Sequence, residues 1–492
     1  MSTQGRAASA AMLLLAGCAV GPDFKRPAAP DVHGYTAQPL TGAVASPDPA
    51  AGQPQRFVNG AEISGQWWTL FHSKALSALI DQALADNPDL KAARAALRAA
   101  HETTLAQRGA YFPSVSAGVS ATHQHQSVQI APTPNSNTFE YSIFTPQVSV
   151  SYVPDVFGLN RRTVESLQAQ EQAVRYQALA TYTTLTANVV LTAVQQASVN
   201  EQIRATHALI DADARSLEIL QDQKDKGYSS GLDVAAQKAQ LAQAQATLPP
   251  LVKQSAQLHD LLAVLVGGFP SQAPAATLVL SDLELPQELP LSLPSALVEQ
   301  RPDVLQAEAN LHAASAQVGV AVANRLPNIE LTASAGSSAL ALDQLFTSGT
   351  NFWGVGGALT QPIFQGGALK HRERAARAAY DQAAQQYRST VLTAFQNVAD
   401  TLTALEQDAE GLKAAAAAAD AARVSLDGAQ RQLKDGYIAG PALLTAEQGY
   451  QQAQISLVQA EANRFADTAA LFQALGGGWW GHDSPAGNDH DK

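Results

Sequence analysis

The chain has little that could support a disulfide framework or a multi-cysteine metal site. Its 492 residues include one cysteine, Cys18, and a single thiol can form neither of these. Charged residues make up only 15%, well below the usual quarter, and 43 acidic residues outnumber 31 basic ones. An acidic chain lacks the basic surface that displaces counterions from nucleic acid, so a general nucleic-acid binder is excluded.

Long apolar runs are also missing. After the first 17 residues no run of eighteen apolar residues occurs, so no transmembrane helix is expected. A membrane role would therefore have to come from a lipid anchor, from β-strands, or from both.

Catalytic and metal-binding motifs are absent or incomplete. Gly227–Gly231 fits the G-x-S-x-G pattern, but helices are expected on both sides, whereas a nucleophile elbow follows a strand. His101 opens an H-E-x-x pattern that ends in Leu105 instead of histidine. His123 and His125 could share one strand face, but two ligands without a third are weak, and we expect a polar loop edge there. With no phosphate-loop motif either, we expect no enzyme, no cofactor and no bound metal.

The first residues form a targeting signal. Arg6 precedes an apolar stretch at 7–16, and small residues lead to Cys18. The ending Leu15-Ala16-Gly17-Cys18 resembles a bacterial lipobox, in which the cysteine is lipidated and becomes the first mature residue. Residue 19 is alanine and not aspartate, which by the sorting rule of such lipoproteins implies the outer membrane. We therefore expect residues 1–17 to be a lipoprotein signal peptide. The alternative is an ordinary signal peptide with a chance cysteine.

Helix signals and strand signals alternate along the first half. Residues 18–60 are rich in proline, alanine and glycine and predict an extended leash with no packed element. Leucines at helix spacing predict a helix around residues 76–84, and Pro88 opens a second one that runs to about Gly109. Residues 115–121 and 148–152 alternate between apolar and small polar side chains, which predicts two strands joined by a polar loop at 123–142.

A much longer helix is expected next. No proline or glycine occurs from Leu159 to Lys226, and a helix of this length would span about 100 Å. The glycines of 227–231 break it, and a returning helix is expected from Leu232 to about Val266. Pro249-Pro250 is expected to kink or split that helix.

The same order recurs in the second half, which indicates an internal repeat. Pro88–Pro113 aligns without gaps on Pro302–Pro327, with eight identities in 26 positions. Two alternating segments, a long helix and a turn at 436–440 follow, as in the first half. We divide the chain into a first repeat at 61–270, a linker at 271–300, a second repeat at 301–478 and a disordered tail at 479–492.

Four strands in one chain cannot close a barrel, and open sheet edges are not tolerated in lipid. If the strands span a membrane, the chain must oligomerise: two copies give eight strands and three give twelve. The long helices are rich in alanine and glutamine, which suits close packing on two sides. A solvated coiled coil, in a structural or adhesive lipoprotein, is the alternative, but it leaves the four amphipathic strands unexplained.

The chain resembles the TolC-like outer-membrane factors, and most closely their lipoprotein branch, the NodT-type efflux channels. The resemblance extends from Leu15 to Trp480, and the order and spacing of its motifs make it specific. These motifs are Val20-Gly21-Pro22-Asp23-Phe24-Lys25-Arg26-Pro27, Trp67-Trp68-Thr69-Leu70-Phe71, Arg301-Pro302-Asp303-Val304, Arg325-Leu326-Pro327-Asn328-Ile329, Gln361-Pro362-Ile363-Phe364-Gln365-Gly366-Gly367 and Leu475-Gly476-Gly477-Gly478-Trp479.

This resemblance implies an α+β membrane channel. Long helices would form a periplasmic α-barrel, and four strands per chain would contribute to a twelve-stranded outer-membrane β-barrel in a homotrimer. The channel would sit in outer-membrane lipid and conduct small molecules passively, working with a periplasmic adaptor and an inner-membrane transporter of the resistance–nodulation–division class. A type I protein-secretion conduit would share the architecture and is the alternative function.

The resemblance also suggests where the channel closes and docks. The two turns would lie at the periplasmic tip, where Gly227, Tyr228, Gly231, Gly436, Tyr437 and Gly440 are candidates for adaptor contact. Many family members place an aspartate ring at the aperture, but the aligned residue here is Thr445, followed by Glu447. We expect that Glu447 or Asp233 substitutes for it, or that gating is mainly steric.

Overall fold

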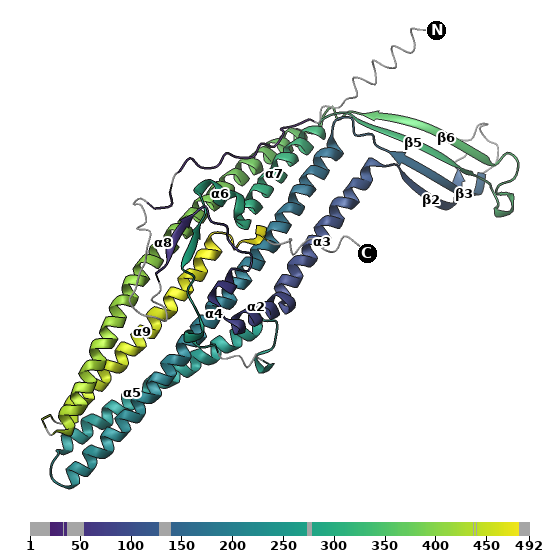
Figure 1. Cartoon of the computed structure of the whole chain (residues 1–492). Coiled ribbons are helices and arrows are strands. Elements are labelled where there is room, and N and C mark those ends of the chain that lie inside the picture. The colour runs from purple at the N-terminus through teal and green to yellow at the C-terminus, as the bar shows by residue number, and fades with distance from the viewer. Residues whose placement is uncertain are drawn as a thin grey trace. The chain divides into compact units, whose positions relative to one another are not determined.

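The computed structural model describes residues 20–32, 34–36, 54–126, 139–272, 278–435, 437–438 and 440–481. The chain divides into two compact units, and Figure 1 labels their elements. The first unit contains the residues up to Arg26, Leu97–Ala173 and Ala307–Tyr387, and the second contains Pro27–Ala96, Val174–Gln306 and Arg388–Lys492. In the described ranges no helix combines the length and the apolar character needed to cross a membrane.

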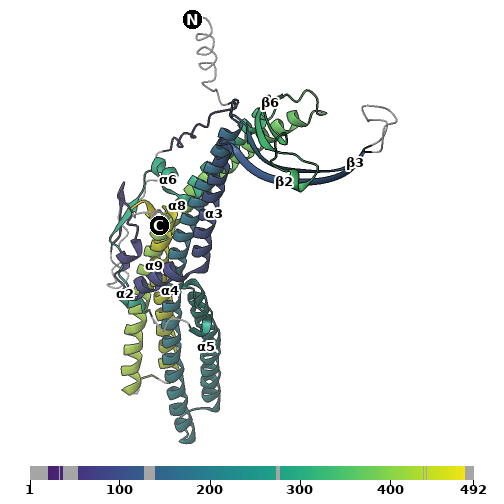
Figure 2. The same ribbon diagram turned by 90° about the vertical axis from the view of Figure 1, so that its right-hand side faces the viewer.

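The first unit is built on an antiparallel sheet with the strand order β2-β3-β5-β6. The strands are β2 (Ser114–Gln126), β3 (Phe139–Tyr152), β5 (Asn328–Ser337) and β6 (Asn351–Thr360). A short 3-10 helix, η2 (Gly109–Tyr111), precedes β2, and a second one, η6 (Leu342–Gln344), lies between β5 and β6. Each half of the chain therefore supplies one hairpin, as the repeat predicts, and Figure 2 shows β2 and β3 as long curved strands.

The two faces of this sheet differ in chemistry. One face carries aligned apolar rows, read in the order β2, β3, β5, β6: Val115, Val150, Ala333, Val355, and then Ala117, Val148, Ala335, Trp353. The opposite face carries the row Ser116, Ser149, Ser334, Gly354. The apolar side chains at the edges are strongly exposed, with Trp353 and Val355 each 77% exposed. Alternation with a period of two thus gives the sheet one uncovered apolar face and one face of small, polar side chains.

The loop predicted at 123–142 is shorter than expected. Strand β2 continues to Gln126, β3 begins at Phe139, and His123 pairs with Ser142. The prediction was wrong here because the polar composition of His123–Gln126 hid the continued pairing of the two strands. Backbone hydrogen bonds to Phe139–Ser142, where aromatic and polar side chains alternate, extend the hairpin.

Four long helices have residues in both units: α3 (Pro88–Arg108), α4 (Leu159–Asp225), α7 (Pro302–Ala323) and α8 (Ala368–Lys434). Helices α4 and α8 each have 67 residues, close to the expected bounds. The returning helices are α5 (Gly231–Leu265) and α9 (Gly440–Ala474), both of 35 residues. Pro249 and Pro250 lie inside α5 and do not split it, so of the two predicted effects only a kink remains as a prediction. Buried side chains on both sides of the prolines, Ala244 and Leu258 among them, hold the helix in place.

The remaining elements belong to the second unit. They are β1 (Arg56–Asn59), η1 (Trp67–Phe71), α2 (Lys74–Asp86), η4 (Pro270–Gln272), η5 (Leu280–Asp282), β4 (Glu288–Leu291), α6 (Pro294–Gln300) and η7 (Trp479–Gly481). An aromatic cluster forms part of the core: Trp67 stacks on Phe472 with ring centres 5.2 Å apart, and Phe71 lies 6.1 Å from Phe465. The Trp67–Phe71 motif therefore packs η1 against α9.

The Arg301-Pro302-Asp303 motif holds the start of α7. Arg301 is 7% exposed, and its guanidinium donates to both carboxylate oxygens of Asp303 at 2.9 and 2.6 Å. It also donates to the carbonyl of Ala474 at 2.8 Å. A charged fork of this kind is both strong and directional, so it ties the first residues of α7 to the last residue of α9.

Three segments expected to be unpacked contribute packed structure. Strand β1, in the predicted leash, pairs in parallel with β4, in the predicted linker. Leu280, Leu289 and Leu297, also in that linker, are buried. At the start of the predicted tail, the indole of Trp479 donates to the carbonyl of Gln300 at 2.7 Å. For these residues the expectations were wrong, because pairing between segments far apart in the chain leaves no local periodicity to detect.

Candidate functional site

The turn between α4 and α5 closes α4 through paired backbone bonds. The Gly227 N–H donates to the Lys224 carbonyl at 2.9 Å, and the Tyr228 N–H donates to the Gln223 carbonyl at 2.8 Å. Gly227 has a φ of +81°, in the left-handed region that glycine adopts at little cost. This is the geometry with which helices commonly end at a glycine.

The side chain of Asp233 caps the start of α5. The Ser230 hydroxyl accepts from the Asp233 N–H at 3.1 Å, and the Asp233 carboxylate accepts from the Ser230 N–H at 3.0 Å. The hydroxyl of Ser230 also donates to that carboxylate at 2.8 Å, and that of Ser229 does so at 3.3 Å. These bonds, those of Ser230 foremost, lower the pKa of Asp233. The carboxylate thus stays ionised and serves as half of a capping box.

The second turn has different chemistry. The Tyr437 N–H donates to the Gln432 carbonyl at 2.8 Å, and Gly440 begins α9. A β-carbon on Gly440 would lie 3.4 Å from Leu220 of α4, so this end of α9 packs closely on α4. Tyr228 and Tyr437 are exposed by 83% and 81%. Gly436, also predicted to be at the tip, lies outside the described residues, as does Cys18.

The candidate gate residue Glu447 lies against α4. Burial, together with the charge of Asp213, raises the pKa of Glu447, and a hydrogen bond from Ser216 acts the other way. Burial likewise raises the pKa of Asp213, which is 0% exposed. Thr445, the other candidate on α9, is exposed.

A polar residue of α5 completes a buried cluster with these two carboxyls. The Gln237 amide donates to the backbone carbonyl of Asp213 at 3.0 Å and to its carboxylate at 3.4 Å. Within the described ranges, the Asp213 Oδ2, Gln237 Oε1 and Glu447 Oε2 atoms are buried and have no hydrogen-bond partner. Sequence reasoning missed Asp213 and Gln237, because nothing in their local pattern distinguishes them from other polar helix residues.

The histidines singled out in the sequence make ordinary contacts. His123 lies 3.0 Å from both the Ser142 hydroxyl and the Glu140 carboxylate, and His101 lies 2.9 Å from Glu171. No group of three or more potential metal-ligating side chains occurs among the residues that the structure describes. The acidic, histidine-containing segment 482–492 lies outside them.

The comparisons with known proteins agree with this architecture. The profile of the outer membrane efflux protein family matches residues 79–268 and 293–477, in two segments as the repeat requires. The toluene efflux pump outer membrane protein TtgC of Pseudomonas putida is 30% identical over 473 residues, which cover 95% of this chain and 94% of TtgC. The antibiotic efflux pump outer membrane protein ArpC of Pseudomonas putida has the same identity and coverage. The outer-membrane channel OprN superposes with a TM-score of 0.82 at 27% identity, covering 94% of this chain and all of that one.

Paired amphipathic hairpins, two very long helices and these matches define an outer-membrane efflux channel subunit. The chain belongs to the outer membrane efflux protein family. Three predictions from the sequence are confirmed. They are the family, the mainly helical fold with an internal repeat and four strands in the hairpin sheet, and the role as an efflux channel.

Proposed function

We propose that three copies of this chain assemble into one gated efflux channel in the outer membrane. The observation that carries the proposal is the order of the sheet. Strands β2 and β6 end it, and each of them pairs on one side only among the described residues. The apolar face of the sheet suits lipid, but the unpaired backbone groups of its two edges do not. Edge-to-edge pairing of three copies would satisfy them and close a ring of twelve strands.

The channel conducts passively. The face with the row Ser116, Ser149, Ser334 and Gly354 would line a wide, water-filled passage that has little chemical selectivity. An inner-membrane transporter of the resistance–nodulation–division class supplies the energy and selects the cargo. The names of TtgC and ArpC, which refer to toluene and antibiotics, support small, largely apolar molecules as that cargo.

Lipidation of Cys18 anchors each copy to the outer membrane, and the helical part extends into the periplasm. A periplasmic adaptor docks at the two helix turns, where Tyr228 and Tyr437 present their rings to solvent. The residues proposed for docking are Gly227, Tyr228, Gly231, Gly436, Tyr437 and Gly440. Asp233, Thr445 and Glu447 are the candidates for the gate.

In-cell photo-cross-linking from the turns tests this function. A photoreactive residue replaces Tyr228 or Tyr437, and captured proteins are identified by mass spectrometry. We expect a periplasmic adaptor together with a resistance–nodulation–division transporter. A photoreactive residue at Leu392, exposed on α8 and far along the chain from either turn, is the matched control and should not enrich them.

Other outcomes would change the conclusion. Capture of an ATP-driven exporter would move the protein to type I secretion. Capture of neither partner, with no trimer on a gel of unheated sample, would overturn the channel proposal.

A further inference from the structure

The beginning of the described chain is held by one buried arginine. The guanidinium of Arg162, on α4, donates to the carbonyls of Val20 at 3.1 Å and Gly21 at 3.4 Å. It also donates to the carboxylates of Asp23 at 2.7 Å and Glu165 at 2.8 Å. Its side chain is only 5% exposed. Three of these four acceptors belong to Val20, Gly21 and Asp23, so the buried cation forms a specific clamp for this short segment.

Neighbouring contacts fix the same segment against α7. A β-carbon on Gly21 would lie 2.4 Å from the α-carbon of Gly319, so only glycine allows this approach. The ring of Phe24 stacks on His312 at 4.3 Å, and Arg26 forms an ion pair with Glu308 at 3.0 Å. Residues 20–26 are therefore docked along their whole length, although their composition predicts a leash.

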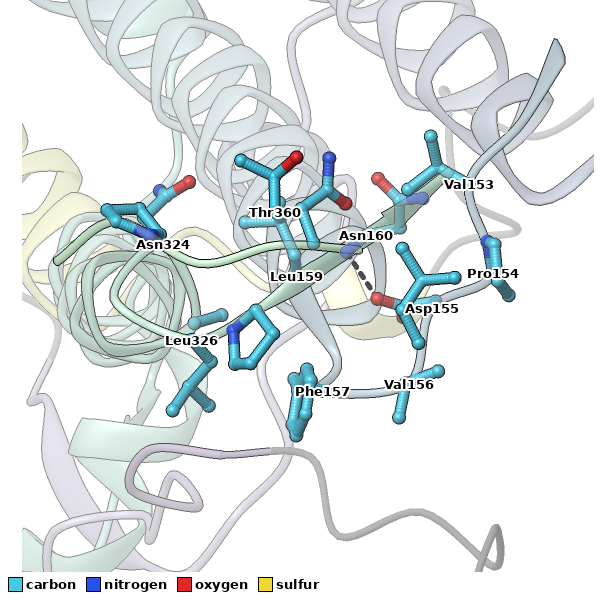
Figure 3. Close-up of a pocket in the computed structure, with 15 residues that line it drawn as sticks. Val153, Pro154, Asp155, Val156, Phe157, Leu159, Asn160, Asn324, Leu326 and Thr360 are labelled. Carbon is cyan, nitrogen blue, oxygen red and sulfur yellow. Dashed lines mark hydrogen bonds between the residues drawn. The ribbon is translucent and has the colours of Figure 1, made fainter. Parts of the chain in front are cut away.

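The clamp brings Val20 to the wall of a cavity. The Val20 N–H donates to the carbonyl of Phe157 at 3.3 Å. Phe157 lines a cavity of about 290 Å³ where β3 leads into α4 and α7 leads into β5. Figure 3 shows the loop of Val153–Asn160 on one side of this cavity and Asn324 with Leu326 on the other. This volume is near the lower end of those of ligand pockets.

Much of the cavity lining is apolar, and the carboxylate of Asp155 in its wall is already engaged. Asp155 accepts from the N–H groups of Asn160 and Arg161, both at 2.9 Å, so it caps α4 and does not call for a polar ligand. The dashed line in Figure 3 marks the first of these bonds. The apolar lining comes from Val156, Phe157, Leu159, Leu326, Pro327 and Ile329.

We propose that this cavity seats one of the acyl chains carried by Cys18, while the remaining chains enter the lipid. The proposal rests on the lipidation proposed above. Cys18 precedes Val20 by two residues, so its α-carbon lies within about 7 Å of the α-carbon of Val20. A fatty acyl chain attached there reaches the cavity without any change in residues 20–26. The clamp fixes Val20, the first described residue, and the cavity offers apolar side chains close to it.

The seat gives the Val20–Pro27 motif a purpose beyond tethering. A leash would let the anchor attach anywhere within its length. The clamp instead places the lipidated end at the junction of sheet and helices, so the anchor also fixes the height of the subunit relative to the lipid.

The test uses the full-length chain in cells that process lipoproteins and are fed palmitate with a mid-chain diazirine. Mass spectrometry of the amino-terminal peptide first shows whether Cys18 is acylated. After illumination, we expect the labelled amino-terminal peptide to be joined to peptides containing residues 153–160 or 324–329.

Two variants sharpen the test. Leu326→Trp fills the cavity and should lower these cross-links at least fivefold while leaving acylation unchanged. Leu340→Trp, in the exposed stretch between β5 and β6, is the matched control and should have no effect. Arg162→Gln should spread the cross-links over peptides outside 153–160 and 324–329, because it releases Val20.

The failures are distinguishable. An acylated Cys18 whose cross-links fall elsewhere on the chain, or only on phospholipid, overturns the seat alone. Residues 153–160 joined to labelled phospholipid, and not to the amino-terminal peptide, would show that free lipid occupies the cavity. An unmodified Cys18 overturns both the lipid anchor and its seat, but leaves the efflux function to its own test.

Discussion

Asp467 on α9 and Asp408 on α8 form a carboxyl pair in the second unit. Burial, and then the hydrogen bond and charge of Asp408, raise the pKa of Asp467 from 3.8 to about 7. A group whose pKa is raised on folding stabilises the fold below its unfolded pKa, and this stability is lost as pH rises through the folded pKa. The contact between α8 and α9 therefore weakens between about pH 4 and pH 7.

We predict that Asp467→Asn removes this dependence, because an amide cannot ionise. At pH 8 the variant should be more stable than the parent by about 1 kcal/mol, a value reduced by solvent screening of this partly buried pair. At pH 4, close to the unfolded pKa of 3.8, the difference should nearly vanish. Thermal unfolding of detergent-solubilised protein at both pH values measures it. Asp420→Asn, on the exposed surface of α8, is the control, and an equal gain at both pH values would contradict the argument.

Glu447 is the residue at which gating can be tested. Its carboxyl faces Asp213 and has a raised pKa, so removing it changes both packing and charge. We predict that Glu447→Ala raises single-channel conductance or sensitivity to cations by about twofold. Glu447→Gln keeps the shape and separates the effect of charge from that of packing. Unchanged conductance in planar bilayers for both variants would count against Glu447 as the gate.

At the scale of elements, the two helix turns differ in how the following helix starts. Helix α5 begins with the capping box of Ser230 and Asp233. When Gly436 is aligned on Gly227, the corresponding residues before and in α9 are Ala439 and Ala442, which cannot form such a box.

We predict that Ser230→Ala weakens only the first of these helix starts. Loss of the cap costs about 1 kcal/mol, so the amides at the start of α5 should exchange with deuterium about fivefold faster. The start of α9 in the same sample is an internal control. Equal acceleration at both turns would point to a global loss of stability and not to a cap.

The elements were largely predictable from local patterns, and the exceptions have one physical origin. Alternation predicted β2 and β5, and unbroken helix formers predicted α4 and α8. Strands β1 and β4 were missed because their pairing joins Arg56 to Glu288, a contact that no local window contains. The cluster of Asp213, Gln237 and Glu447 was missed for the same reason, since three helices must meet before its chemistry exists.

At the scale of the whole molecule, the repeat predicts how copies should pair. Within one chain, Ser149 of β3 pairs with Ser334 of β5. The repeat matches β2 with β5 and β3 with β6, since Ser114 pairs with Ser151 in one hairpin and Asn328 pairs with Thr360 in the other. By this alignment Ser149 of β3 corresponds to Ala358 of β6, and Ser334 of β5 corresponds to Ser120 of β2. If contacts between copies copy the contact within a chain, Ala358 of one copy lies opposite Ser120 of the next.

We predict that the double variant Ser120→Cys, Ala358→Cys forms disulfides between copies on mild oxidation. Covalent dimers and trimers should then appear on denaturing gels, because paired antiparallel positions bring β-carbons within disulfide range. Ser149→Cys with Ser334→Cys is the control: it should close within one chain and leave the apparent mass monomeric. If Ser120→Cys with Gly354→Cys cross-linked better, the register inferred from the repeat would be wrong.

The unequal turns lower the symmetry of the proposed assembly. Had the two halves stayed identical, three copies would present six equivalent tips. Instead the tips alternate around the ring, one with the hydroxyls of Ser229 and Ser230 and the next with Ile438 and Ala439 in their place. Any protein that embraces the whole ring therefore meets two chemically distinct seats, each repeated three times, and must either be asymmetric itself or bind the two with different strength.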